Sequence, residues 1–139
     1  MPIHDYHFTT VDEVSRPMLL VRISNPKDPT KCSYPILAKV DPGTDVSIFP
    51  SDVADEVDID LTHAKKAKVT GVMTTGEGRV SKARIEVFEP DHSLISGATQ
   101  TSDICFVEGS CLFLLGANFL KPFVLTIDYP NEVFSITRP

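Results

Sequence analysis

Short stretches of β-branched and other apolar residues recur along the chain, separated by Pro, Gly, Asn and Asp. The spacing of about 3.6 residues that marks an amphipathic helix is nearly absent. Short strands with turn-forming residues between them are typical of an all-β barrel or sandwich. The pattern predicts strands at residues 18–24, 35–40, 47–49, 67–72, 79–88, 101–107, 112–115, 124–128 and 133–137.

Two stretches depart from this pattern and predict short helices. Residues 50–57 offer Ser51 as an N-cap, with acidic residues in the first turn. Residues 116–123 have room for about one helical turn before Pro122 ends it. Residues 24–33 and 89–100 are rich in turn formers and are expected to be surface connections. Residues 129–132 are expected to form the tight turn of a C-terminal hairpin.

The composition is ordinary for a soluble globular protein and disfavours several kinds of partner. The 139 residues are 42% apolar and 23% charged, and fit a single domain, residues 1–139. A net charge of −6 disfavours binding to nucleic acid or to an anionic membrane. No apolar run approaches the roughly 18 residues of a membrane span, and no secretory signal is visible. Three cysteines without a CxxC spacing are typical of reduced, mostly buried thiols, so a cytoplasmic location is expected.

No metal or other cofactor is expected from the sequence. His4 and His7 have an HxxH spacing, but they lie in a polar terminal segment without a Cys or Glu partner beside them. The glycines of GVMTTGEG are not followed by Lys-Ser/Thr, as a phosphate-binding loop requires.

The segment DPGTDVSIFP, residues 41–50, is the strongest candidate for chemistry. Asp-Pro-Gly is a common turn tripeptide, so on this evidence alone Asp41 is a turn residue. It follows the apolar stretch YPILAKV, however, and Gly43, Thr44 and Ser47 are small enough to let another backbone come close. A carboxylate at the end of a buried strand carries a desolvation cost unless something uses or satisfies it. A plain turn and a functional carboxylate therefore both stay open.

The sequence VDPGTDVSIFP resembles the active-site segment of retropepsin-like aspartic proteases, which run apolar–Asp–Thr/Ser–Gly–small and then Ser/Thr–apolar–apolar–Pro. RPMLLVRI is similar to the first strands of bacterial members. VTGVMTTGEGRV, residues 69–80, stands where the family has its flap, a Gly-tipped hairpin that folds over substrate. Residues 112–137 resemble the apolar–apolar–Gly element, short helix and closing hairpin that end the domain.

The resemblance implies a closed acid-protease barrel with one or two short helices and one lobe per chain. It implies an aspartic endopeptidase in which two Asp41 carboxylates, one from each chain of a homodimer, activate water against an extended peptide or protein substrate. The chain itself has only one Asp-x-Gly at the end of an apolar strand, which also favours a site shared by two chains. Residues 1–15 are then an N-terminal extension or a dimer strand. The active-site loop would contain Pro42, Gly43, Thr44 and Asp45, and the flap would bind substrate through Gly71, Val72, Met73, Thr74, Gly76 and Gly78.

Three positions depart from the family's pattern. Pro42 replaces a Thr or Ser whose hydroxyl and amide join a hydrogen-bond lattice beneath the paired aspartates, and proline supplies neither donor. Ala117 stands where an Arg usually follows the Gly, so Asp45 lacks a charged partner. Lys39 stands where relatives are mostly apolar, and a cation there favours ionised carboxylates or restricts the substrate pocket.

Three interpretations of the chain stay open. In the first, Pro42 is a tolerated variant whose fixed φ suits the loop, and the protein is an active protease. In the second, Pro42 marks an inactive member of the family. The alternative function is accordingly a catalytically inactive retropepsin-fold domain for dimerisation or peptide binding. The third is an unrelated β-barrel in which DPG is only a turn.

Overall fold

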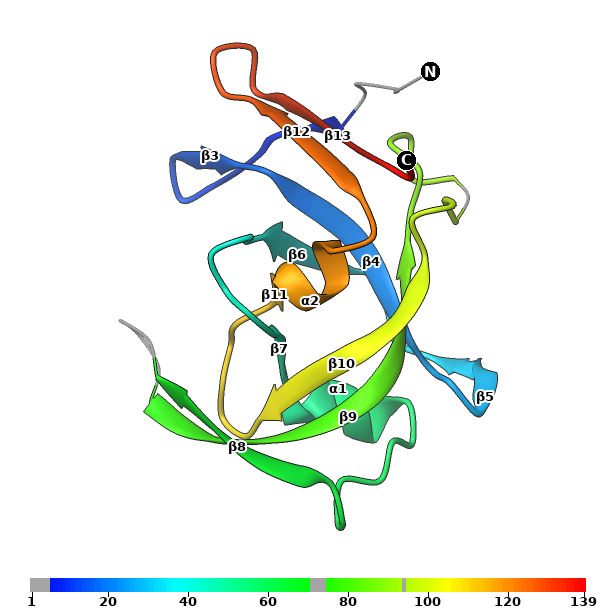
Figure 1. Cartoon of the computed structure of the whole chain (residues 1–139). Helices are drawn as coiled ribbons and strands as arrows, with labels where there is room; N and C mark the ends of the chain where they lie inside the picture. Colours follow the sequence, from blue (N-terminus) through cyan, green and yellow to red (C-terminus); the bar gives the residue numbers. More distant parts are fainter. Residues whose placement is uncertain (1–5, 71–74, 94) are drawn as a thin grey trace.

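The computed structural model describes residues 6–70, 75–93 and 95–139, which form a mostly β structure with two short helices (Figure 1). The helices are α1 (Ser51–Glu56) and α2 (Ala117–Leu120). The strands are β1 (Tyr6–His7), β2 (Thr9–Val11), β3 (Val14–Arg16), β4 (Met18–Asn25), β5 (Asp28–Cys32), β6 (Ile36–Val40), β7 (Ser47–Pro50), β8 (Lys65–Thr70), β9 (Thr75–Val87), β10 (Gln100–Val107), β11 (Leu114–Leu115), β12 (Val124–Asp128) and β13 (Val133–Thr137).

The main sheet closes into a barrel. Its strand order is β5-β4-β6-β11-β7-β10-β9-β8, and a further antiparallel pairing of β4 with β9 closes the ring between these two strands. β9 reaches both β10 and β4 because it is 13 residues long. Among the described residues, β5 and β8 are the edge strands that remain in this sheet. The expected all-β closed barrel with one or two short helices is thereby confirmed.

One large apolar cluster fills the barrel. Leu19, Val21 and Ile23 alternate along β4 with less buried residues and are fully buried, as expected for a strand with one face toward a core. The largest fully buried side chains are phenylalanines from four different elements, namely Phe49, Phe106, Phe119 and Phe134. This packing holds β6, β7 and β11, which carry the candidate site, in one rigid framework.

A second, three-stranded sheet has the order β1-β13-β12 and brings the first and the last described strands together (Figure 1). Tyr6 of β1 pairs with Phe134 of β13, and their rings stack with centroids 5.2 Å apart. The following strands β2 and β3 form a separate hairpin, whose turn residues Asp12 and Glu13 both have positive φ, 52° and 67°. Two successive positive φ values are typical of the tight turns that match the twist of paired strands.

Tyr6 provides a test of how the terminal sheet is attached to the barrel. Its phenol donates a hydrogen bond of 2.8 Å to the carbonyl of Phe88. Burial of the side chain raises the pKa of Tyr6 above its ordinary value of 10.0. The folded state therefore holds the phenol proton more tightly than the unfolded state, and this stability is present below pH 10 and is lost as pH rises through the higher folded value.

We expect Tyr6→Phe to cost about 1 kcal/mol at pH 7 through loss of this hydrogen bond. The difference from the wild-type protein should shrink above pH 10, because only the wild-type protein has this phenol to ionise. Urea unfolding of both proteins at pH 7 and pH 10.5 measures the two differences. An unchanged or larger difference at the higher pH would contradict the assignment.

Two sequence predictions about local structure are wrong. Residues 24–33, expected to be only a surface connection, contain β5, which pairs with β4 through Ser24 and Cys32. β5 escaped detection because it is a polar edge strand that contains Pro29, a residue tolerated only where no ladder amide is needed. Ser51 is not the N-cap of α1, since Pro50 occupies that position and no side chain caps the helix.

The cysteines also differ from expectation in their exposure. All three are free, but only Cys105 is buried, whereas Cys32 is half-buried and Cys111 is exposed. In the turn that follows β12, the carboxylate of Asp128 accepts a hydrogen bond of 3.1 Å from the amide of Asn131.

Candidate active site

The loop that carries Asp41 joins two strands that are not neighbours. β6 and β7 are separated in the sheet by β11, which pairs parallel with β6 and antiparallel with β7. Residues 41–46 must therefore cross the end of β11. The amide of Asp41 donates a hydrogen bond of 3.0 Å to the carbonyl of Leu115 in that strand. Asp41 is thus fixed to the barrel at the point where the chain leaves β6.

The side chain of Asp41 is part of the turn and also extends beyond it. The amide of Gly43 donates to Oδ1 of Asp41 at 3.1 Å, and the amide of Thr44 donates to its backbone carbonyl at 3.2 Å. This is the arrangement in which an Asp side chain mimics a backbone turn. Oδ2 takes no part in it, and the side chain remains 26% exposed. A turn role and a positioned carboxylate are therefore compatible in the same residue.

Lys39 is the charged neighbour of this carboxylate. Its Nζ lies 3.8 Å from Oδ2 of Asp41. Residues two positions apart along an extended chain point to the same face, which allows this contact. The lysine side chain is 40% exposed, so solvent screens the pair and its contribution to stability is at most about 1 kcal/mol. The contact places a positive charge beside Asp41, whose side chain stays partly exposed to solvent.

Gly116 explains how the loop can lie so close to the chain beneath it. This glycine directly follows β11, and a Cβ there would lie 2.7 Å from the carbonyl oxygen of Thr44 and 2.6 Å from the carbonyl carbon of Val46. The next amide, of Ala117, donates to the carbonyl of Thr44 at 2.7 Å. The small residues of the Asp41 loop predicted that a second backbone segment lies against it. In the structure this segment consists of Gly116 and Ala117.

Asn118 is a residue of this site that sequence reasoning missed. Its Oδ1 accepts hydrogen bonds from the amide and the hydroxyl of Ser47, at 2.9 and 3.1 Å, and its Nδ2 donates to the carbonyl of Asp103 at 2.7 Å. The Ser47 hydroxyl also accepts from the amide of Gly116 at 3.0 Å. One amide side chain thus ties α2 to β7 and β10. The available signal was an Asn at the start of a predicted helix, where such a residue is favoured only if its side chain bonds to backbone.

The remaining loop residues lie at the surface. Pro42, Gly43 and Asp45 are exposed, and Thr44 is half-buried. The backbone carbonyl of Asp45 accepts from the amide of Asn118 at 3.1 Å. Within the described residues its carboxylate makes no salt bridge, in line with the alanine at position 117.

The expected flap, residues 69–80, includes the end of β8 and the beginning of β9. These antiparallel strands pair from Lys65 with Val80 to Thr70 with Thr75. Gly76 and Gly78 both lie within β9. The other four proposed flap residues lie outside the described part of the chain, and they are Gly71, Val72, Met73 and Thr74.

Gly78 is needed for close packing of β9 on β10. A Cβ at this position would overlap Sγ of Cys105 and lie 3.2 Å from the carbonyl oxygen of Phe106. Its backbone pairs with both Val107 and Ala67. The absence of a side chain at this glycine is therefore explained by packing.

A small apolar cluster joins the strands of the site to this hairpin. It is distinct from the main core and combines residues of β7 and β10 with partly buried residues around them. The buried members are Ile48, Cys105 and Val107, and the partly buried ones are Val46, Ala67, Val80, Leu112 and Leu114. Apolar surface that is incompletely covered thus lies on strands adjacent to the Asp41 loop.

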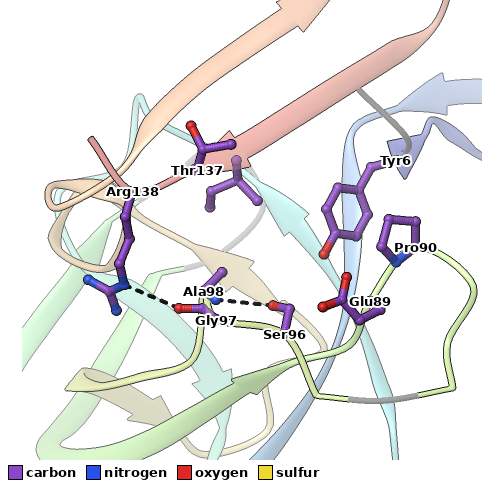
Figure 2. A pocket seen from close by; sticks show the side chains of 9 residues that line it. Tyr6, Glu89, Pro90, Ser96, Gly97, Ala98, Thr137 and Arg138 are labelled. Carbon is purple, nitrogen blue, oxygen red and sulfur yellow. Dashed lines mark hydrogen bonds between the residues drawn. The ribbon is translucent and has the colours of Figure 1, made fainter. Parts of the chain in front are cut away.

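A pocket of about 320 Å³ lies elsewhere, between the end of β13 and the connection from β9 to β10 (Figure 2). Tyr6, Glu89, Ser96 and Arg138 supply its polar groups, and none of its lining residues belongs to the Asp41 loop. In the described part of the chain no three His, Cys, Asp or Glu side chains are grouped as a metal site would require. No helix among these residues has the length and hydropathy to cross a membrane.

The fold and site together define a single-lobed β-barrel with one carboxylate loop held over a central strand. Among solved structures, the chain is similar to the EIAV protease complexed with the inhibitor HBY-793, with a TM-score of 0.44 and 17% sequence identity over 81% of this chain and 92% of that chain. No protein-family model matches the chain, and no curated protein matches it significantly.

Proposed function

We propose that the chain is one protomer of a retropepsin-type aspartic endopeptidase, which hydrolyses extended peptide segments as a homodimer. The proposal is supported above all by the way in which Asp41 is held. Its backbone is bonded to β11, one carboxylate oxygen is bound within the turn, and the other stays outside it on a partly exposed side chain. Gly116 and the hydrogen bonds of Asn118 hold the loop that carries this carboxylate against the barrel.

The proposed chemistry needs two carboxylates around one water molecule. One Asp41 takes the proton of the water as general base, while the other donates a proton to the scissile carbonyl. Two carboxylates a few Å apart cannot both be ionised, so the pair holds one proton between them, as in aspartic proteases generally. The described chain supplies one such residue, and the second would come from an identical partner through a two-fold axis.

The substrate class follows from the surroundings of the loop. β8 is an edge strand, and an extended peptide can bind next to such strands through main-chain hydrogen bonds. The partly buried Val46, Leu112 and Leu114 offer apolar surface for substrate side chains. We therefore propose peptides with apolar residues near the cleaved bond, rather than acidic or basic ones.

The test is digestion of a peptide library between pH 4 and pH 7 by the wild-type protein and by Asp41→Asn. Cleavage by the wild-type protein that disappears in the variant supports the proposal. Cleavage that persists in the variant would assign the activity to other residues or to a contaminant. No cleavage by either protein, with both folded and dimeric, favours the alternative of an inactive dimerisation or peptide-binding domain.

The presence of Pro42 favours the inactive alternative. Compared with the Thr or Ser of the family's pattern, proline lacks both the backbone amide and the hydroxyl beside Asp41. We expect Pro42→Thr to raise kcat/KM by up to about 100-fold, because a carboxylate positioned to within 1 Å reacts that much faster than a loose one. Pro42→Ala is the matched control, since it restores the amide without the hydroxyl. Steady-state kinetics on one cleaved peptide measure both. Equal rates for all three proteins would show that Pro42 is a tolerated variant.

A further inference from the structure

The β2–β3 hairpin, residues 9–16, lies on the same side of the barrel as the Asp41 loop. β4 runs antiparallel to β6 with Met18 opposite Lys39, and the amide of Val40 donates to the carbonyl of Pro17 at 3.0 Å. The residues before Met18 therefore lie beyond the end of β6 from which Asp41 emerges. Figure 1 shows the hairpin and the loop between β6 and β7 extending toward the same edge of the molecule.

The hairpin has an apolar pair that the described residues leave about half exposed. Val11 and Val14 are directly paired across the two strands and are 43% and 47% exposed. The hairpin has a defined turn at Asp12 and Glu13, and Thr10 and Ser15 are joined by a hydrogen bond of 2.6 Å between their hydroxyls. A short two-stranded hairpin is marginally stable in water unless it packs against something.

We propose that this hairpin is a dimerisation arm, in which Val11 and Val14 pack against a second copy of the chain. The inference rests on the proposed function, because a site with one Asp41 per chain is incomplete until a partner approaches this side. Val14 lies within about 10 Å of Pro17 along the strand, so a partner that brings its own Asp41 to the loop approaches the side of the barrel on which the hairpin lies. A second copy is therefore the occupant that the position of the arm selects.

The chemistry of the tip also favours an arm that lies on the partner's flank. Asp12 and Glu13 place two negative charges at the turn of each hairpin. Two such tips repel each other, so the hairpins of a dimer do not meet tip to tip. The valine pair, one step back from the tip, remains available for apolar contact with the partner.

Sedimentation equilibrium of the double variant Val11→Lys/Val14→Lys tests the arm. A dimer contains four of these half-exposed valines, and their loss should weaken dimerisation about 100-fold. Tyr34→Lys is the matched control, because Tyr34 is 83% exposed in the connection between β5 and β6 and is expected to lie away from the partner. Circular dichroism and thermal melting show whether each variant is folded.

The milder variant Val11→Thr/Val14→Thr keeps the β-branched shape and should weaken the dimer to a smaller degree. A wild-type dimer whose dissociation constant is unchanged in both valine variants would overturn the arm and leave the protease proposal standing. A wild-type protein that stays monomeric would overturn both. A dimer that depends on the valines but cleaves no peptide would support the arm and count against the protease.

Discussion

Mixing wild-type chains with Asp41→Asn chains is expected to lower peptidase activity as the square of the wild-type fraction. If both carboxylates of a dimer are needed, a mixed dimer is inactive, because asparagine can neither accept nor donate the proton that the reaction moves. At equal amounts of the two chains roughly a quarter of the dimers would be active, whereas independent sites would retain about half. Pure Asp41→Asn should lose about 10²–10⁴-fold in kcat/KM.

The measurement is a titration of the variant into the wild-type protein, with exchange of subunits allowed by refolding. Asp55→Asn is the matched control, because Asp55 lies in α1 outside the Asp41 loop, is exposed, and makes no salt bridge within the described residues. Its chains should substitute for wild-type chains with little loss of activity. A linear fall of activity with Asp41→Asn would contradict a shared site, whatever the oligomeric state.

Gly116→Ala is expected to destabilise the protein by about 3 kcal/mol, near the upper end for overpacking. The new Cβ would meet backbone atoms of Thr44 and Val46 at 2.6–2.7 Å, and backbone cannot rotate aside as a side chain does. For a domain of this size the melting temperature should fall by roughly 10 °C. The loop that carries Asp41 would also be displaced, so the activity of the remaining folded protein should decrease.

Gly97→Ala provides the control for this substitution. A Cβ at Gly97 meets nothing within 4 Å, so this variant should lie within about 0.5 kcal/mol of the wild-type protein. Thermal and urea unfolding of the two alanine variants give the comparison. Similar stabilities for both would mean that the loop does not pass over Gly116 as closely as described.

Local patterns in the sequence were sufficient to predict most strands. β12 and β13 were predicted at their observed bounds, Val124–Asp128 and Val133–Thr137, because apolar residues and turn formers alternate clearly there. β5 was missed, since its polar residues DPTKC have no apolar period. β9 was predicted too short because Gly76 and Gly78 weaken the strand signal, although Gly78 is required by contact with β10.

The support of the candidate site was harder to predict than its carboxylate. Asp41 is recognisable because Asp-Pro-Gly follows an apolar strand. The insertion of β11 between β6 and β7 depends on pairing between distant segments, which no local period reveals. The close contacts of Gly116 follow from that insertion and were therefore beyond sequence reasoning, whereas the only signal for Asn118 was an Asn at the start of a predicted helix.

The insertion of β11 also constrains the order of events during synthesis. Ser47 and Gly116 touch through a hydrogen bond although 69 residues separate them in the chain. Such distant contacts form late, because the intervening segment must first be made and ordered. A nascent chain that has not yet released Gly116 from the ribosome has no strand beneath its acidic loop, so the growing polypeptide cannot hold Asp41 in its final position until Leu114, Leu115 and Gly116 have emerged.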